Sequence, residues 1–273
     1  MKQVIIQLNN VYYSITDENL SLTSNKSFEI LSNISLKIYK QEILGICGES
    51  GGGKTTLIKL IAGILLPVKG EIKVDHNISS KRNRINKIQI LFQNNSDLLN
   101  PFRKVKDVID EIIVLSENKR VDIEKEKEKL FNLLGISAAL ENRRGNELSG
   151  GERQRIALAR LLAAKPRILI LDEPFSAQDV ISQLNFLKIL KRINNEMKIT
   201  IICISHDLNM LKKLVDRVVV LQNGRIVETA DTSELFKSPN HSYTKFLLRA
   251  EDFSLTEDEI RSYNSNKTST ETI

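Results

Sequence analysis

Tryptophan is absent from this 273-residue chain, and cysteine, histidine and proline are scarce, with two, three and five residues. Cys47 and Cys203 lie within aliphatic runs, and two thiols are too few for a disulfide framework or a zinc cluster, so we expect both to be buried and reduced. The longest nearly apolar stretch is residues 61–68, whereas a membrane-spanning helix needs about 20 apolar residues. The N-terminus MKQVIIQLNN lacks the apolar core of a secretory signal. The sequence therefore predicts a chain that does not insert into a membrane by itself and is not exported.

The chain carries 40 basic and 34 acidic residues, a net charge of +6, with the 41% hydrophobic content of an ordinary globular protein. Positive charge is compatible with binding nucleic acid, an anionic membrane face or a phosphorylated ligand. The basic clusters are Lys81, Arg82, Arg84 and Lys87, and then Arg143 with Arg144. Because aromatic residues do not alternate with them, as a stacking platform for single-stranded nucleic acid requires, we expect a solvated or membrane-facing surface.

Short aliphatic runs predict a mostly parallel β-sheet. The runs lie at residues 43–47, 88–92, 168–171, 199–204 and 218–221. They are rich in branched side chains, as expected of strands that are covered on both faces. Nearer the N-terminus, residues 4–13 mix aliphatic and polar side chains and residues 34–38 alternate them, which predicts an antiparallel edge sheet.

Residues 100–164 show helical periodicity instead, most clearly at residues 105–115 and 123–134. We interpret about residues 95–160 as a helical subdomain inserted into a domain that spans residues 1–250. The alternating glutamates and lysines at the start of the second helical segment are expected to form a solvated face. Residues 251–273 are polar, and we expect them to form a flexible tail.

Residues 48–55 read GESGGGKT, a full match to the phosphate-loop pattern GxxxxGK[ST], between an aliphatic run and an amphipathic segment. Glycines let consecutive N–H groups turn toward phosphate oxygens, and the positive end of the following helix adds to the attraction. Lys54 is expected to reach the β- and γ-phosphates, and the Thr55 hydroxyl suits Mg²⁺. The pattern predicts a nucleoside triphosphate bound by Gly48, Glu49, Ser50, Gly51, Gly52, Gly53, Lys54, Thr55 and Thr56.

Residues 168–173 read ILILDE, four aliphatic residues followed by two carboxylates. If this is a buried parallel strand, Asp172 and Glu173 lie at its C-terminal end, where open α/β sheets bind ligands. Asp172 is expected to hold Mg²⁺, and Glu173 is expected to accept a proton from the water that attacks the γ-phosphate. The alternative is that the two carboxylates merely end a strand.

Residues 148–152 read LSGGE and precede a run of strong helix formers. Ser149, Gly150 and Gly151 at a helix start form a second anion-binding turn. One chain then has two helix N-termini that suit phosphate, but only the one at the phosphate loop is accompanied by a lysine and carboxylates. This predicts that each end serves a different nucleotide, so that two chains enclose ATP head to tail.

With SAQD at residues 176–179 and His206 in ISHD, these motifs in this order resemble the nucleotide-binding subunit of an ATP-binding cassette (ABC) transporter. The resemblance covers roughly residues 4–248. It implies a P-loop NTPase (RecA-like) α/β fold, with a mostly parallel sheet, an N-terminal antiparallel β-subdomain and an inserted α-helical subdomain. It implies ATP and Mg²⁺ as cofactors and ATP hydrolysis as the activity.

The resemblance also implies roles for single residues. Gln93 would sense Mg²⁺ and the attacking water, and His206 would hold the γ-phosphate and that water. Asp179 would lie at the dimer seam. Ser149, Gly150 and Gly151 would contact the γ-phosphate bound in the partner subunit.

The chain departs from the family pattern at three places. An aromatic residue usually stacks on adenine four residues after a valine that corresponds to Val11, but Ile15 stands there, and Tyr13 lies two residues earlier on the same strand face. Gln178 replaces the leucine of the usual SALD, and Glu152 stands where glutamine is commoner. None of these departures removes a reacting group.

Residues 97–101 (DLLNP) and 238–248 (SPNHSYTKFLL) are similar to the peptide and nickel importer branch. No cysteine follows Cys203, which favours a nickel-type or dipeptide-type subunit over the oligopeptide type. The branch implies membrane-spanning permease subunits, a second ABC ATPase subunit (a heterodimer, with a homodimer left open) and, indirectly, an extracytoplasmic solute-binding protein. It implies no nucleic acid, and a peripheral location on the cytoplasmic face of the cell membrane.

Two alternatives come from other functional classes. A soluble ABC-type ATPase acting on nucleic acid would carry a long coiled-coil insertion or a second cassette, and neither is in this sequence. A non-hydrolysing regulatory module would lack Glu173 or His206, and both are present.

Overall fold

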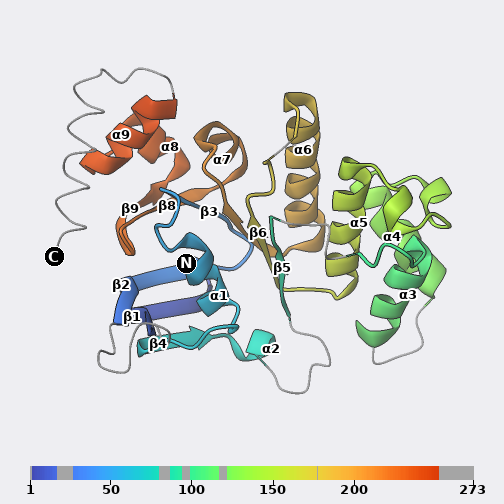
Figure 1. The fold of residues 1–273 in the computed structure, drawn as a ribbon, viewed down its shortest axis with the longest axis horizontal. Coiled ribbons are helices and arrows are strands. Elements are labelled where there is room, and N and C mark those ends of the chain that lie inside the picture. The colour runs from blue at the N-terminus through green and yellow to red at the C-terminus, as the bar shows by residue number, and fades with distance from the viewer. Residues whose placement is uncertain are drawn as a thin grey trace.

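The computed structural model describes residues 2–16, 27–79, 87–93, 99–116, 122–176 and 178–251. In this part of the chain, six strands form a large sheet in the order β5-β6-β7-β3-β8-β9 and three form a small sheet in the order β2-β1-β4 (Figure 1). The large sheet contains β3 (Ile43–Gly48), β5 (Ile88–Leu91), β6 (Ile168–Asp172), β7 (Thr200–Ile204), β8 (Arg217–Gln222) and β9 (Arg225–Asp231). The small sheet contains β1 (Val4–Thr16), β2 (Ser27–Tyr39) and β4 (Lys69–Val74).

The large sheet is parallel except for β9, which pairs antiparallel with β8 at the edge. Every residue of β3, β6 and β7 is buried, which explains why these strands are continuous aliphatic runs in the sequence. The small sheet is antiparallel throughout. Both the mostly parallel sheet and the antiparallel N-terminal sheet predicted from the sequence are confirmed.

Helix α1 (Lys54–Ile61) lies between the two sheets and joins their cores (Figure 1). Its buried residues pack in one cluster with aliphatic side chains of β1, β2 and the facing side of the large sheet. The other side of that sheet is covered by helices that include α6 (Val180–Met197) and α7 (Leu208–Leu214). Burial of each large aliphatic side chain contributes about 1.5–3 kcal/mol, so this packing fixes the position of α1, whose first residue is Lys54.

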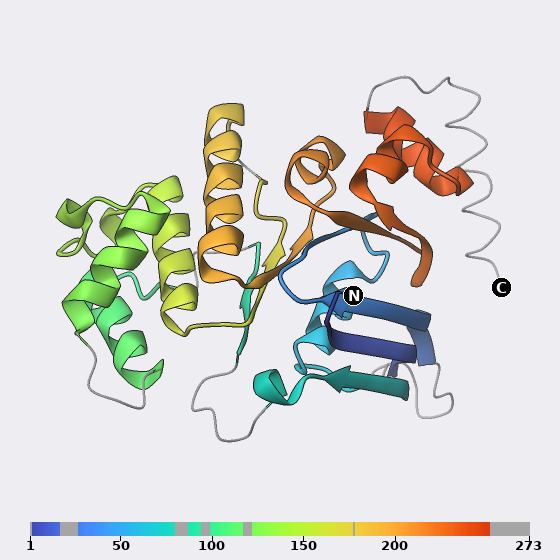
Figure 2. The same ribbon diagram turned by 180° about the vertical axis from the view of Figure 1, so that it is seen from behind.

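Helices α3 (Val105–Ser116), α4 (Ile123–Leu134) and α5 (Gly150–Ala163) pack together at the end of the molecule opposite α8 (Thr232–Lys237) and α9 (Ser242–Glu251), as Figures 1 and 2 show. They form the helical unit expected from the periodicity. The remaining helices of the described part are α2 (His76–Ser79) and two short 3₁₀ turns, Ala138–Leu140 and Gly145–Glu147.

The prediction that the charged residues of α4 form a solvated face is wrong at one residue. Lys127 is only 2% exposed, and its Nζ lies 3.0 Å from a carboxylate oxygen of Glu124, 3.3 Å from Asp110 and 3.6 Å from Glu141. Burial opposes the charged form, but these three carboxylates hold the pKa of Lys127 above its usual range. The Lys127 ammonium therefore links α4 to α3 and to the turn before α5, and it is not exposed to solvent.

A buried carboxylate anchors the C-terminal helix. Glu228 of β9 accepts hydrogen bonds from the backbone N–H groups of Asn240 and His241 at 2.8 and 3.0 Å, directly before α9. Part of the SPNHSYT stretch that pointed to the importer branch is therefore the attachment point of this helix. The expected tail lies outside the described residues from 252 on, as do residues 81, 82, 84, 97 and 98 of the basic and DLLNP segments. In the described ranges, no helix combines the length and the apolar character needed to cross a bilayer.

Candidate nucleotide-binding site

The predicted site residues meet because the strands before them are parallel neighbours. Strands β3, β5, β6 and β7 all end at the same edge of the large sheet, and the loops that leave them surround a cavity of about 460 Å³. From the phosphate loop and α1, the cavity is lined by Ser50, Gly51, Gly53, Lys54, Thr55 and Thr56. From the other strand ends, it is lined by Gln93, Asp172, Glu173 and His206. Segments far apart in the sequence thus line one cavity.

Two glycines shape the phosphate loop. Gly48 has φ +142°, and a Cβ there would lie 2.0 Å from the carbonyl oxygen of Leu221 on the neighbouring strand. Gly53 has φ +91°, and a Cβ there would lie 2.7 Å from Leu31 of β2. Because any other residue would displace the loop at both points, these positions require glycine. Gly53 directly precedes α1, so the loop turns into the helix with the N-terminal N–H groups of α1 facing the cavity side.

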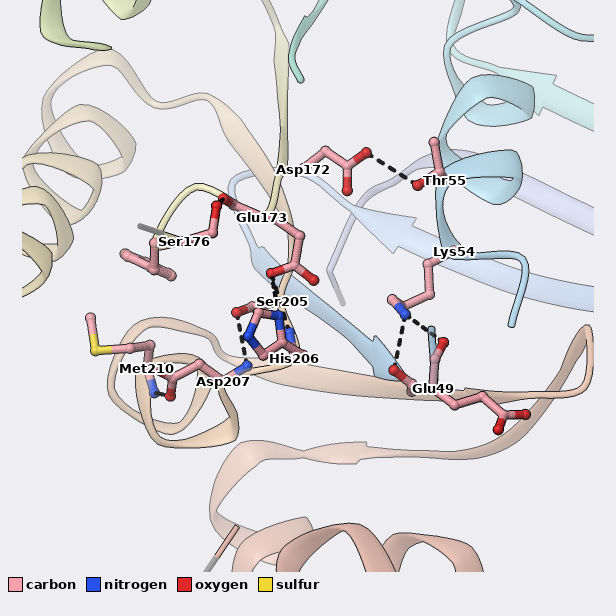
Figure 3. Close-up of polar contacts among 12 residues, drawn as sticks. Glu49, Lys54, Thr55, Asp172, Glu173, Ser176, Ser205, His206, Asp207 and Met210 are labelled. Carbon is pink, nitrogen blue, oxygen red and sulfur yellow. Dashed lines mark hydrogen bonds and ion pairs between the residues drawn. The ribbon is translucent and has the colours of Figure 1, made fainter. Parts of the chain in front are cut away.

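Lys54 holds the loop together from inside. Its Nζ donates hydrogen bonds to the carbonyl oxygens of Gly48 and Glu49, at 2.9 and 2.7 Å (Figure 3). Burial lowers the pKa of Lys54, although nearby acidic groups, Glu173 first among them, oppose the shift. A partly desolvated ammonium beside a cavity is a favourable partner for a phosphate, because it has lost much of its hydration already.

Across the cavity, the hydroxyl of Thr55 lies 3.2 Å from a carboxylate oxygen of Asp172 (Figure 3). Burial raises the pKa of Asp172, while the Thr55 hydrogen bond and Lys54 oppose the rise. A hydroxyl, a carboxylate and the Gln93 amide are oxygen ligands of the kind that Mg²⁺ prefers. Among the described residues, no group of three or more His, Cys, Asp or Glu forms a metal site. These residues therefore fit a cation that also takes oxygens from a bound phosphate.

Glu173 adopts φ +52°, a left-handed conformation that is uncommon outside glycine and costs about 1–2 kcal/mol. The turn is held by the Glu173 N–H, which donates to Ile204, and by the Ser176 hydroxyl, which donates to the Glu173 carbonyl. It directs the Glu173 carboxylate away from Asp172 and toward His206, whose Nδ1 lies 2.8 Å from it (Figure 3). Strain at such a residue is a pointer to function.

His206 follows β7 and stands immediately before Asp207, the N-cap of α7, whose side chain accepts from the N–H of Met210 at 2.8 Å. The histidine side chain is 71% exposed, whereas that of Glu173 is 14% exposed. His206 therefore presents its ring to the open side of the cavity, and Glu173 lies beneath it.

Ser149, Gly150 and Gly151 are not among the residues that line the Lys54 cavity. Ser149 is the N-cap of α5 and forms a capping box: its hydroxyl accepts from the N–H of Glu152, and the Glu152 carboxylate accepts from the N–H of Ser149. A Cβ added at either glycine would meet open space. The helix N-terminus is thus exposed and separate from the chain's own phosphate loop, and its predicted role in a partner's site stays a prediction.

A neighbouring cavity of about 270 Å³ contains Gly150, Gly151 and Asp179, and shares Gln93 and Glu173 with the nucleotide cavity. Asp179 is the N-cap of α6, accepting from the N–H of Ser182 at 2.9 Å. The structure therefore places Asp179, the predicted seam residue, beside Gly150 and Gly151.

Tyr13, the residue that the sequence suggested for adenine, does not line the cavity. Its ring is partly buried against the core between the sheets, and its strand partner is Leu31. Ile15 instead pairs with Phe28, and the two side chains are 50% and 53% exposed. Phe28 lies two residues before Ile30, which lines the cavity. Sequence reasoning missed Phe28 and Ile30, because their position depends on register shifts between β1 and β2.

Comparison with known families agrees with this arrangement. Residues 31–176, from β2 through the loop after Glu173, match the family model described as ABC transporter. The chain belongs to the ABC transporter family. Its fold is the ABC ATPase fold, and its activity is ATP hydrolysis for transport.

Similar ABC proteins include the oligopeptide transport ATP-binding protein OppF of Streptococcus mutans, 37% identical over 246 residues that cover 85% of this chain and 80% of the relative. The dipeptide transport ATP-binding protein DppF of Haemophilus influenzae is 34% identical over 229 residues, covering 81% and 69%. Both relatives are transport proteins, which favours the transporter interpretation over the nucleic-acid ATPase left open by the sequence.

Solved ABC structures show the same fold. The dimeric post-hydrolysis state of the ATP-binding cassette MJ0796, bound to ADP and Pi, superposes with a TM-score of 0.70 at 25% identity, covering 84% of this chain and 99% of that one. For cbiO1 of Clostridium perfringens, part of the ABC transporter complex cbiONQ, the TM-score is 0.73 at 27% identity, covering 87% and 92%.

Proposed function

We propose that this ABC ATPase drives a peptide importer. Relatives over more than four fifths of the chain are named for oligopeptide and dipeptide transport, and none of those described above is named for nickel. The observation that carries the catalytic part is the convergence of Lys54, Thr55, Asp172, Glu173 and His206 on one cavity. Nickel import, which the sequence left open, has no such support.

The residues that line the cavity have different roles in ATP hydrolysis. The phosphate-loop N–H groups and Lys54 bind the triphosphate, and Thr55, Asp172 and Gln93 would hold Mg²⁺, which neutralises phosphate charge when bound. Glu173 accepts the proton of a water whose oxygen attacks the γ-phosphorus, and the bond to the β-phosphate oxygen breaks, giving ADP and inorganic phosphate. His206, in contact with the Glu173 carboxylate, orients that carboxylate and the water.

The base of ATP would lie on the pair of Ile15 and Phe28. A planar base needs an apolar surface, and stacking on an aromatic ring contributes about 1–3 kcal/mol. Phe28 lies two residues before Ile30, which lines the cavity, on the same strand. The half-exposed pair therefore lies near the part of the cavity that Ile30 lines. Phe28 of β2 would supply the aromatic ring that β1 lacks at Ile15.

The complete site would need two subunits. Ser149, Gly150 and Gly151 lie outside the chain's own nucleotide cavity on an exposed helix N-terminus that suits an anion, and the related MJ0796 cassette is described as a dimer. A second ABC ATPase subunit, related rather than identical as the branch implies, would close this end over the γ-phosphate. Permease subunits would take up the motion through the surface around Gln93 and the helical unit, at the cytoplasmic face of the membrane.

The test is purification of the chain from membranes with its bound subunits, followed by reconstitution in vesicles. We expect peptides to stimulate ATP hydrolysis, and the stimulation to be absent in the Glu173→Gln variant. Stimulation by nickel chelates but not by peptides would overturn the peptide assignment. Stimulation by DNA, falling steeply with salt, would restore the nucleic-acid alternative.

A further inference from the structure

A second concave site lies at the opposite edge of the large sheet from the nucleotide cavity. Its volume is about 590 Å³, within the range of small-molecule sites. Its wall includes Ile43, the first residue of β3, and Asp216, which directly precedes β8. Strand β3 ends at Gly48 in the phosphate loop, and at about 3.3 Å per residue the strand separates the two cavities by roughly 16 Å. The two cavities are therefore distinct sites.

Four lysines from three helices converge on this cavity: Lys191 of α6, Lys212 and Lys213 of α7, and Lys237 of α8. No ion pair to any of them exists within the described ranges of the chain. Asp216 alone is acidic among the described lining residues, and one of its carboxylate oxygens already accepts the N–H of Ile43 at 2.8 Å. The wall thus carries an excess of positive charge, which a concave surface concentrates.

Two of the neutral polar groups in the wall are already used. Asn194 donates from Nδ2 to two backbone carbonyl oxygens, at 2.8 and 3.1 Å, and the Thr232 hydroxyl donates to a third at 2.7 Å. The apolar residues of the lining are Ile43, Leu214, Val215 and Phe236. The ammonium of Lys212 lies 5.3 Å from the centre of the Phe236 ring. The cavity therefore presents positively charged hydrogen-bond donors next to apolar side chains.

We propose that this lysine cavity binds a phosphate-bearing anion with an apolar portion. Phosphate oxygens are acceptors that match ammonium donors in both charge and hydrogen bonding. The apolar portion would cover Leu214 and Phe236. Such a ligand comes either from solution, as a phosphorylated metabolite, or from an anionic lipid headgroup at the membrane surface. The phosphate chemistry is common to both sources.

The test separates this cavity from the nucleotide site by using the full chain with Lys54→Ala, which removes phosphate binding at the phosphate loop. Inorganic tripolyphosphate is titrated into this variant by calorimetry. Adding Lys213→Gln and Lys237→Gln is expected to weaken binding about tenfold, or 1.4 kcal/mol. The matched control adds Lys37→Gln and Lys245→Gln, two exposed lysines outside the cavity with the same change in net charge, and should bind as the parent does. Circular dichroism confirms the fold of each variant.

A second arm identifies the source of the phosphate. The same variants are floated with vesicles of phosphatidylcholine, with or without phosphatidylglycerol. Vesicle binding that requires phosphatidylglycerol and is lost with Lys213 and Lys237 supports the proposal with a lipid headgroup as the ligand. Binding of tripolyphosphate alone supports it with a soluble ligand. The proposal is overturned if neither probe binds the Lys54→Ala variant, or if the control pair weakens binding as much as the cavity pair.

Discussion

Gln178 donates from its Nε2 to the Oε1 of Gln154 at 2.6 Å and to the carbonyl oxygen of Pro174 at 3.0 Å. Gln154 in turn donates to the same carbonyl at 2.8 Å. Gln178, which replaces the usual leucine in SAQD, thus joins the segment before α6 to helix α5, next to Glu173, the proposed proton acceptor. The departure noted in the sequence is a polar link between two parts of the site.

Replacing either glutamine of this pair with leucine removes the hydrogen bond between the two amides and leaves the remaining glutamine with only its bond to the Pro174 carbonyl. We expect Gln178→Leu and Gln154→Leu each to lower the free energy of unfolding by about 1–2 kcal/mol. The double variant should lose less than the sum, because each single substitution already removes the hydrogen bond between the two amides. Urea unfolding of the three variants measures this. Strictly additive losses would show that the two amides do not interact.

The proposed role of Glu173 as the proton acceptor, beside His206, predicts the effect of removing its charge. Glu173→Gln keeps the shape of the side chain but cannot accept a proton, so we expect hydrolysis to fall by about 10²–10⁴-fold while ATP affinity is kept. ATP should then accumulate in a stable dimer, measured by size-exclusion chromatography with light scattering. Glu71→Gln, an exposed glutamate paired with Lys73, is the control. Wild-type turnover by Glu173→Gln would remove Glu173 from its proposed role.

Phe28→Ala tests the proposed base platform. Loss of the ring should weaken ATP binding by about 5- to 150-fold, from the stacking energy of about 1–3 kcal/mol, and Phe28→Trp should restore it. Fluorescence titration of ATP against each variant gives the affinities. Phe102→Ala is the matched control, since Phe102 is exposed and does not line the cavity. Unchanged affinity in Phe28→Ala would place the base elsewhere.

The strands that carry the site could be predicted because a buried parallel strand must be aliphatic along its whole length. β6 reads ILILD and β7 reads TIICI, and the phosphate-loop pattern identifies the loop between β3 and α1. By contrast, β4 reads KGEIKV and is mostly exposed, so it carries no apolar signal. Its pairing with β1 is a property of the tertiary structure.

Contacts between distant segments could not be predicted from the sequence, for a related reason. Glu173 and His206 meet only because β6 and β7 are neighbours, and no local pattern states the strand order. Phe28 faces Ile15 only because β1 and β2 shift register beside Tyr13, which moves each side chain after the shift to the other face. Lys127 was expected to be solvated because two of its three carboxylate partners, Asp110 and Glu141, come from outside its own helix.

The anchor of α9 makes stability depend on pH. Burial of Glu228 opposes its ionisation, but the hydrogen bonds that it accepts hold its pKa below the usual range. A carboxylate whose pKa is lower in the folded state stabilises that state above its unfolded pKa, and the contribution is lost as the pH falls through the folded value. The free energy of unfolding of Glu228→Gln should therefore be about 1–2 kcal/mol lower than that of wild type at pH 7. This difference between the two proteins should narrow below about pH 4.

Urea unfolding of wild type and Glu228→Gln across this pH range measures the difference, and limited proteolysis reports release of α9. Glu196→Gln is the control, because Glu196 pairs with Arg192 at the exposed surface of α6 and such pairs contribute little. A gap between wild type and Glu228→Gln that stays constant down to acid pH would show that shape, and not the charge on Glu228, holds α9 to β9. Since Asn240 donates its backbone N–H group, substitution of the Asn240 side chain should not reproduce the effect.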